Sequence, residues 1–279
     1  DVADFDGFAD HVRELLDGAA GADLAVLPEL VTFELMTAVD GWRDAADLAP
    51  ALETARFAEQ YREFLSREAT ARRQHILGGS HLVRTDDGGL LNVAPLFGPT
   101  GRLLHEHRKT HLFPLEHTLG IGEGDDMTVV ELPFAVVGIN ICYEAEIPEC
   151  SGSLAEQGAQ VVLCPSLTLT EAGFWRVRHC LAARAIENQV YAVHATVTSP
   201  ARGPWPGAWG RSAILGPCDV GWPDDGVIDE SAPNTDAVAR ADLDLERLAE
   251  NRKTGAATTY AARRRRADRY DVWPSHLSR

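Results

Sequence analysis

Apolar residues recur along this chain at two spacings, one typical of helices and one typical of strands. Apolar positions three and four residues apart predict amphipathic helices, and they occur at residues 5–16, 52–73, 148–157 and 171–187. Short apolar runs between turn residues predict strands, and they occur at residues 24–27, 75–83, 90–97, 102–109, 128–132, 134–141, 161–164, 190–197, 211–215, 226–229 and 237–243. Because these elements alternate without an internal repeat or a linker, we expect one α/β domain, residues 1–279, with mixed sheets.

Turn-forming residues separate some of these runs. Gly-Pro-Thr-Gly at 98–101 lies between two strand-like runs and predicts an antiparallel hairpin. Residues 110–127 are polar and contain glycine, and residues 202–208 are rich in Pro, Gly and Trp, so both stretches are predicted to be loops. The sheet that contains the hairpin is therefore expected to be mixed.

Composition narrows the class of protein. Of 279 residues, 45% are hydrophobic and 24% are charged, which is typical of a folded globular protein. The chain has 26 Lys and Arg against 42 Asp and Glu, a net charge of −16, so nucleic acid is not an expected partner. No apolar run approaches the roughly 18 to 20 residues that cross a bilayer, so no membrane association is expected either.

The five cysteines are scattered, odd in number and without a CxxC pair. This usage favours reduced thiols and predicts a cytoplasmic location. The first ten residues are acidic and lack the regions of a signal peptide. Residue 1 is Asp rather than Met, which leaves open whether the N-terminus is truncated.

Three residues whose side chains could take part in catalysis lie at the carboxyl ends of predicted strands: Glu29, Lys109 and Cys142. That edge of an α/β sheet usually holds the chemistry. A thiol beside backbone N–H groups and a lysine is expected to have a lowered pKa and to react as a thiolate. A carboxylate could move its proton and the lysine could stabilise an oxyanion. Such a trio predicts acyl transfer from an amide.

Each of the three residues also fits an ordinary structural role. A cysteine at the end of an apolar strand is usually a small buried side chain, the glutamate after Pro28 fits a turn, and the lysine after Arg108 fits a solvated surface. Composition and spacing alone favour these roles. A Cys-His protease that uses His179 or His194 is a poorer alternative, because it leaves the lysine and the glutamate without a role.

Three stretches around these residues resemble the nitrilase superfamily of carbon-nitrogen hydrolases. They are Leu-Ala-Val-Leu-Pro-Glu-Leu at 24–30, His-Arg-Lys-Thr-His-Leu-Phe at 107–113, and Gly-Ile-Asn-Ile-Cys-Tyr-Glu at 138–144, which runs on to Pro148 and Glu149. Two further blocks, at 184–188 and 210–214, agree. The order and approximate spacing match those of the family over nearly the whole chain. Residues 170–178 and 216–219 look like a poorly characterised branch of predicted amidohydrolases without a firm substrate.

The resemblance implies a four-layer αββα sandwich with two mixed β-sheets and a Glu-Lys-Cys triad. By position, Glu29 would be the general base and acid, Lys109 the oxyanion stabiliser and Cys142 the nucleophile that forms a thioester. Glu116 would support the lysine and position the substrate, and Tyr143 would act through its backbone N–H. The implied reaction is hydrolysis of a small-molecule amide to a carboxylic acid and ammonia. A nitrilase, an N-carbamoyl amidohydrolase or a catalytically idle binding module remains an alternative.

The resemblance also bears on assembly and completeness. Members usually form homodimers, so residues 252–279 are expected to be a C-terminal tail at an oligomer interface. Members begin with a strand before the first helix, and about five residues precede the first helix here, so one sheet edge could be incomplete. Many relatives have Arg or Phe near the positions of Glu146 and Ile147, so the pocket is expected to differ there.

Several other residues carry weaker signals. Arg176 could clamp a substrate carboxylate or form a structural ion pair. The set Cys164, His179 and Cys180 lacks the paired spacing of zinc ligands, so neither a metal nor another cofactor is expected. The basic run 263–266 is expected on a solvated face or against a neighbouring subunit. Three aromatic residues could line a pocket or belong to the core: Phe174, Trp205 and Trp209.

Overall fold

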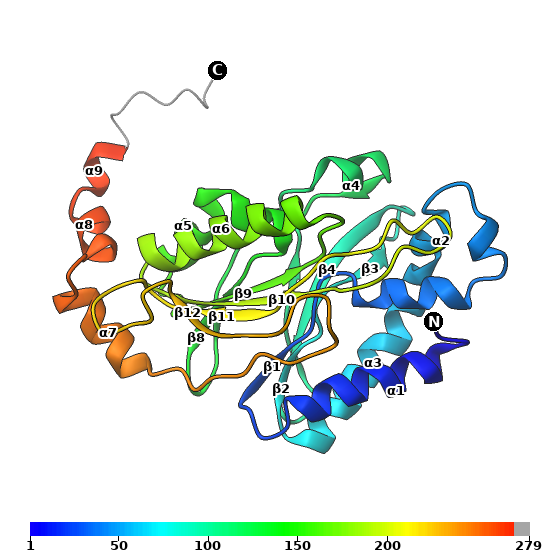
Figure 1. Cartoon of the computed structure of the whole chain (residues 1–279), viewed down its shortest axis with the longest axis horizontal. Helices are drawn as coiled ribbons and strands as arrows, with labels where there is room; N and C mark the ends of the chain where they lie inside the picture. The colour runs from blue at the N-terminus through cyan, green and yellow to red at the C-terminus, as the bar shows by residue number, and fades with distance from the viewer. Residues whose placement is uncertain (271–279) are drawn as a thin grey trace.

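The computed structural model describes residues 1–270; residues 271–279 lie outside the described part. Two β-sheets pack against each other in the middle of the molecule, and helices cover both outer faces (Figure 1). The first sheet has the order β1-β2-β4-β3, with β5 and β6 paired to β4; the second has the order β12-β11-β10-β9-β8-β7. Parallel and antiparallel pairs occur in both sheets. The predicted αββα sandwich with two mixed sheets is confirmed.

The strands of the first sheet are β1 (Leu24–Val26), β2 (His75–Leu77), β3 (His81–Arg84), β4 (Leu90–Phe97), β5 (Leu103–Arg108) and β6 (Ile121–Gly122). Those of the second sheet are β7 (Val130–Glu131), β8 (Val136–Ile139), β9 (Val161–Ser166), β10 (Tyr191–Thr196), β11 (Ala213–Leu215) and β12 (Val227–Glu230). The α-helices are α1 (Phe5–Gly18), α2 (Ala49–Leu52), α3 (Ala58–Arg72), α4 (Pro114–Thr118), α5 (Pro148–Glu156), α6 (Glu171–Glu187), α7 (Leu245–Thr254), α8 (Thr259–Arg265) and α9 (Ala267–Tyr270). The 3₁₀ helices are η1 (Val31–Ala38), η2 (Trp42–Asp44), η3 (Glu53–Phe57) and η4 (Cys142–Glu146).

The main core lies between the two sheets. Leu77 and Leu96 of the first sheet share one buried cluster with Ile139 and Leu163 of the second. A second cluster joins α1 and α3 to the outer face of the first sheet. Burying one such aliphatic or aromatic side chain contributes roughly 1.5 to 3 kcal/mol. The spacing of apolar residues in the sequence decides which side chains are buried, and so it stabilises the packing of these layers.

Four predicted elements differ from the structure. The helix 52–73 begins as η3 and becomes regular only in α3, and the loop 110–127 contains α4 and β6. The strand 75–83 is broken at Gly78–Ser80, where Gly79 has φ 57° and a side chain there would collide with the Pro28 carbonyl. The strand 237–243 does not form. Helices α7, α8 and α9 were not predicted.

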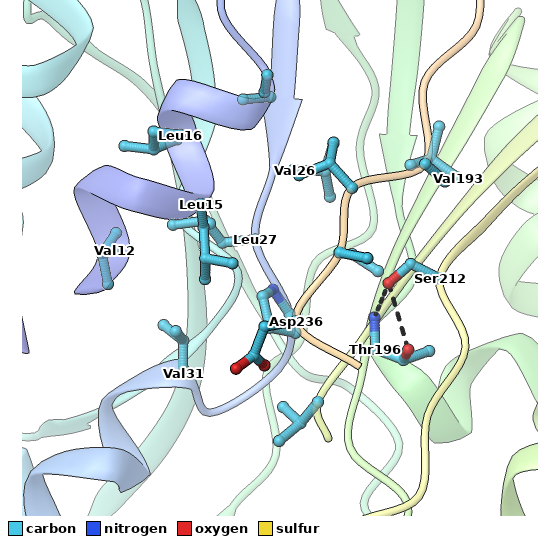
Figure 2. A pocket seen from close by; sticks show the side chains of 18 of the residues that line it. Val12, Leu15, Leu16, Val26, Leu27, Val31, Val193, Thr196, Ser212 and Asp236 are labelled. Atoms are coloured by element: carbon cyan, nitrogen blue, oxygen red, sulfur yellow. Dashed lines mark hydrogen bonds between the residues drawn. The ribbon is translucent and has the colours of Figure 1, made fainter. Parts of the chain in front are cut away.

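A cavity of about 680 Å³ is lined by β1 and by residues 237–243. Strand β1 is paired only with β2, and its other edge faces this cavity. Part of the lining comes from α1, β1 and residues 235–243 (Figure 2), with apolar side chains such as Val12, Leu15 and Val26. Residues 237–243 line the same cavity without pairing to β1, so their backbone lacks a ladder partner.

Residues 252–270 of the predicted tail begin in the last turn of α7 and continue through α8 and α9, which bury none of their residues; residues 271–279 lie outside the described residues. Two arginines of the basic run contact the body of the protein. Arg263 donates to Asn188 Oδ1 at 3.1 Å, and Arg264 donates to the carbonyls of Ala155 and Glu156 at 2.9 Å. Among residues 1–270, no helix is long and apolar enough to cross a membrane.

Candidate active site

The fold brings Glu29, Lys109 and Cys142 into one buried site. Glu29 follows β1, Lys109 directly follows β5, and Cys142 begins η4 shortly after β8. The Lys109 Nζ atom lies 2.7 Å from Glu29 Oε1 and 2.5 Å from Glu116 Oε2. Glu29 and Lys109 come from one sheet and Cys142 from the other, so the site lies across the two sheets.

Lys109 is fully buried but is held between two carboxylates. Burial alone lowers the pKa of Lys109, but the charges of Glu29 and Glu116 more than offset this and hold the pKa above its ordinary value. The ammonium therefore stays charged near neutral pH. An ammonium has three donors and these carboxylates accept from two of them.

Asn92 on β4 links the same two carboxylates. Its Nδ2 donates to Glu29 Oε1 at 3.1 Å and to Glu116 Oε1 at 2.9 Å. Glu116 also accepts from the backbone N–H of Phe113 at 2.9 Å. Burial raises the pKa of Glu29, and the neighbouring charge of Glu116 adds to this, while Lys109 opposes it. Glu29 is therefore a stronger base than an ordinary exposed glutamate.

Cys142 lies in a strained turn that points its thiol at the end of β9. Its φ of 48° is in the left-handed region, which a non-glycine residue adopts at a cost of order 1 to 3 kcal/mol and mostly at functional sites. The Sγ atom lies 3.6 Å from the carbonyl oxygen of Leu167 and 3.2 Å from Ser166 Oγ. The Leu167 N–H donates to Glu29 Oε2 at 2.8 Å, so Leu167 connects the thiol with the carboxylate.

The expected lowering of the thiol pKa is wrong. Burial raises the pKa of Cys142 well above its ordinary value, and the charge of Glu29 raises it further, while Lys109 and Ser166 only oppose this. The positive charge of Lys109 is shared with two carboxylates, so it favours the thiolate less than a free lysine would. The resting residue is a thiol, and its reaction requires a base.

Glu144 links the segment that contains Cys142 to the segment that follows Lys109. Its carboxylate accepts from Ile141 N at 2.5 Å, from Thr110 N at 2.7 Å and from Thr110 Oγ1 at 2.6 Å. His107 Nε2 lies 2.8 Å from the same carboxylate. Burial alone raises the pKa of Glu144, but His107 and Thr110 more than offset this, so the pKa lies below its ordinary value.

Four side chains lie beside the buried Glu29, Lys109 and Cys142: Phe113, Tyr143, Glu146 and Arg176. The ring of Tyr143 meets the ring of Phe113 edge-on at 5.8 Å, and the guanidinium of Arg176 lies 5.9 Å from the Phe113 ring centre. Arg176 Nε donates to Glu146 Oε2 at 2.8 Å. Arg176 therefore forms the ion pair that was its alternative role, and its side chain is still 49% exposed.

The other candidates lie outside this group of residues. His179 stacks on Trp175 at 5.4 Å, Phe174 stacks on His194 at 5.6 Å, and Trp205 meets Phe33 edge-on. Phe174 and Trp209 have ring centres 4.5 Å apart. In the described part of the chain, no three His, Cys, Asp or Glu side chains are grouped as metal ligands would be.

Sequence reasoning missed Asn92, His107, Glu144 and Ser166 as parts of the site. Asn92 carried a usable signal, since it is a polar residue inside the apolar run 90–97 and a buried amide needs partners. Glu144 lies within the quoted stretch 138–144, but nothing local shows that its partners are at 107 and 110. Ser166 follows a buried strand without any distinguishing pattern.

A family model described as carbon-nitrogen hydrolase matches residues 2–253. "Probable hydrolase YhcX" of Bacillus subtilis (strain 168) is 33% identical over 276 residues, which are 95% of this chain and 52% of that protein. The chain thus spans about half the length of that relative. "Omega-amidase NIT2" of Xenopus tropicalis is 32% identical over 264 residues, 90% of this chain and 86% of that protein.

Solved structures share the fold. A carbon-nitrogen hydrolase from Helicobacter pylori G27 has a TM-score of 0.75 and 18% identity, with 97% of this chain and 92% of that chain covered. A mutant amidase from Nesterenkonia sp. AN1, with acrylamide added to its active site cysteine, has a TM-score of 0.66 and 21% identity, with 97% of this chain and 92% of that chain covered. At these identities the likeness shows the fold alone.

Proposed function

The chain belongs to the carbon-nitrogen hydrolase family, and from this premise we propose that it hydrolyses a small-molecule amide to a carboxylic acid and ammonia through a thioester on Cys142. One observation carries the proposal: a lysine held at 2.7 and 2.5 Å between Glu29 and Glu116, beside a buried thiol. Burying so many charges costs stability. Their presence here therefore points to a function.

In the first step the thiol proton of Cys142 passes to the Glu29 carboxylate as sulfur attacks the amide carbonyl. The S–C bond forms and the carbonyl electron pair moves to oxygen. The third N–H of Lys109 and the backbone N–H of Tyr143 then stabilise this oxyanion. Because the free thiol is protonated, Glu29 has to act as a general base at this point.

The second step breaks the C–N bond. Protonated Glu29 gives its proton to the leaving nitrogen, so ammonia departs and the thioester remains. Water then attacks the thioester while Glu29 takes its proton, and the C–S bond breaks as sulfur regains a proton. Glu116 and Asn92 keep Glu29 and Lys109 in place throughout, through the hydrogen bonds described above.

We further propose that Arg176 contributes to substrate choice. Its guanidinium is half-exposed beside Phe113, and one nitrogen is bound to Glu146. The remaining guanidinium donors can bind an acceptor on the part of the substrate away from the amide, a carboxylate being the best match in charge and shape. The relative named an omega-amidase supports an amide substrate.

An ammonia-release assay over a panel of small amides tests the activity. Cys142→Ala should abolish ammonia release, whereas Cys218→Ala, which removes an exposed thiol, should leave it unchanged. Parallel nitrile and N-carbamoyl substrates separate the alternative activities that use the same triad. If no amide is turned over, or if Cys142→Ala retains the wild-type rate, the proposal fails and a binding module becomes the better account.

A homodimer and a cytoplasmic location remain proposals. The dimer rests on the family resemblance and on α8 and α9, which bury none of their own residues. The location rests on five free cysteines, four of them wholly or partly buried. Light scattering on the eluting full chain measures the mass and would contradict the dimer if it gave a monomer.

A further inference from the structure

We infer that Ser166 is an additional catalytic residue of this chain: its hydroxyl donates a hydrogen bond to Cys142 Sγ and stabilises the negative charge that develops on sulfur. The inference deepens the proposed function and rests on Cys142 being the nucleophile. The donor and the sulfur are 3.2 Å apart. Both groups are buried, with Ser166 fully inaccessible.

The fold holds the hydroxyl of Ser166 rigidly. Ser166 is the last residue of β9, which lies between β8 and β10 in the second sheet. It pairs with Thr196 in the ladder, and its carbonyl accepts from Val197 N at 3.0 Å. Cys142 follows the neighbouring strand β8. Because this donor is already held in position by a central strand, little free energy is needed to reorient it when negative charge develops on sulfur.

Within the described part of the chain, the charged and titratable groups around the sulfur do not supply a direct hydrogen-bond donor to it. Glu29 and Cys164 both raise the pKa of Cys142, and Lys109 lowers it. Arg176 interacts electrostatically with Cys142 from the rim of the site, but its side chain is half-exposed and paired with Glu146. Since Lys109 already donates to two carboxylates, the neutral hydroxyl is the donor that contacts the sulfur directly.

Sulfur gains negative charge twice in the proposed cycle. The charge develops first as the thiol proton passes to Glu29 and sulfur attacks the carbonyl, and again when the C–S bond of the thioester breaks. Ser166 keeps its own proton in both steps and transfers nothing. A hydrogen bond to an ionised partner is roughly twice as strong as one between neutral groups, so the hydroxyl favours the thiolate over the thiol.

The test follows alkylation of Cys142 by iodoacetamide as a function of pH, with the labelled peptide identified by mass. For Ser166→Ala we expect the midpoint of the rate profile to rise by about one pH unit, and the rate below the midpoint to fall about tenfold. Ser166→Thr keeps the hydroxyl and should keep the wild-type midpoint. Ser151→Ala removes an equally buried hydroxyl that donates to Asn140 instead, and should also keep it.

An unchanged midpoint in folded Ser166→Ala overturns the inference. If Ser166→Ala does not fold, Ser166→Cys supplies a side chain of similar size with a weaker donor, and its midpoint should lie above that of the wild type; an unchanged midpoint there has the same meaning. Alkylation needs no amide. A shifted midpoint without amide turnover would therefore refute the proposed function and leave the hydrogen bond established.

Discussion

Replacing Glu144 by Gln should destabilise the protein strongly. The Glu144 carboxylate is inaccessible to solvent and accepts hydrogen bonds from Ile141 N, Thr110 N, Thr110 Oγ1 and His107 Nε2. Glutamine has the same shape, but one of its terminal atoms is an NH₂ group that cannot accept. An NH₂ group in place of Oε1 leaves Thr110 N and Thr110 Oγ1 without their acceptor, and one in place of Oε2 leaves Ile141 N without its acceptor.

The expected loss follows from these contacts. Each buried donor without an acceptor costs about 1 to 3 kcal/mol, and more when the lost acceptor is charged, as the Glu144 carboxylate is. We therefore expect Glu144→Gln to lower the free energy of unfolding by about 3 to 5 kcal/mol. A domain is stable by only about 5 to 15 kcal/mol, so this is a large fraction.

Urea denaturation followed by tryptophan fluorescence measures this change. With a slope of about 3 kcal/mol per molar urea, the midpoint should fall by about 1 M or more. Glu146→Gln is the matched control, because within residues 1–270 Glu146 forms its ion pair with the half-exposed Arg176 and such a pair contributes about 1 kcal/mol or less. If Glu144→Gln loses no more stability than Glu146→Gln, the reasoning about the buried carboxylate is refuted.

The pH dependence of the stability of the same variant is an independent test of whether Glu144 is charged in the folded protein. The pKa of folded Glu144 lies below its ordinary value, so its stabilising contribution is present above the unfolded-state pKa and is lost as pH falls through the folded-state pKa. The difference between wild type and Glu144→Gln should therefore shrink in acid. A difference that grows in acid would contradict a carboxylate that is charged in the native state.

Two further predictions concern catalysis. Because Glu29 is the proposed base and burial raises its pKa, kcat/KM should rise with pH through a limb above the usual carboxyl range. Glu116→Gln removes a charge that raises this pKa, so a limb that does not move to lower pH contradicts the assignment. Arg176→Gln should raise KM about tenfold for an amide that carries a carboxylate and leave a neutral amide unaffected; equal effects on both would rule out the specificity role.

Much of the fold was predictable because its signals are local. The helix α1 follows from apolar residues such as Phe8 and Val12, which are buried as their spacing requires. The strand ends near Glu29, Lys109 and Cys142 follow from short apolar runs. The elements that were wrong depend on distant segments: residues 237–243 have strand-like composition, but a strand also needs a ladder partner at hydrogen-bond distance, and these residues line the cavity without pairing with β1.

The sequence by itself determined the layers of the fold and pointed to the residues proposed to carry the chemistry, because periodicity and motif are properties of a short stretch of chain. Only the tertiary structure decided how those residues behave. Cys142 is a thiol with a raised pKa rather than a thiolate, because burial and the nearby Glu29 carboxylate outweigh the partly neutralised Lys109. Hydrogen bonds between residues far apart in the chain, from Asn92 to Glu29 and from Thr110 to Glu144, set the geometry, and no local pattern records them.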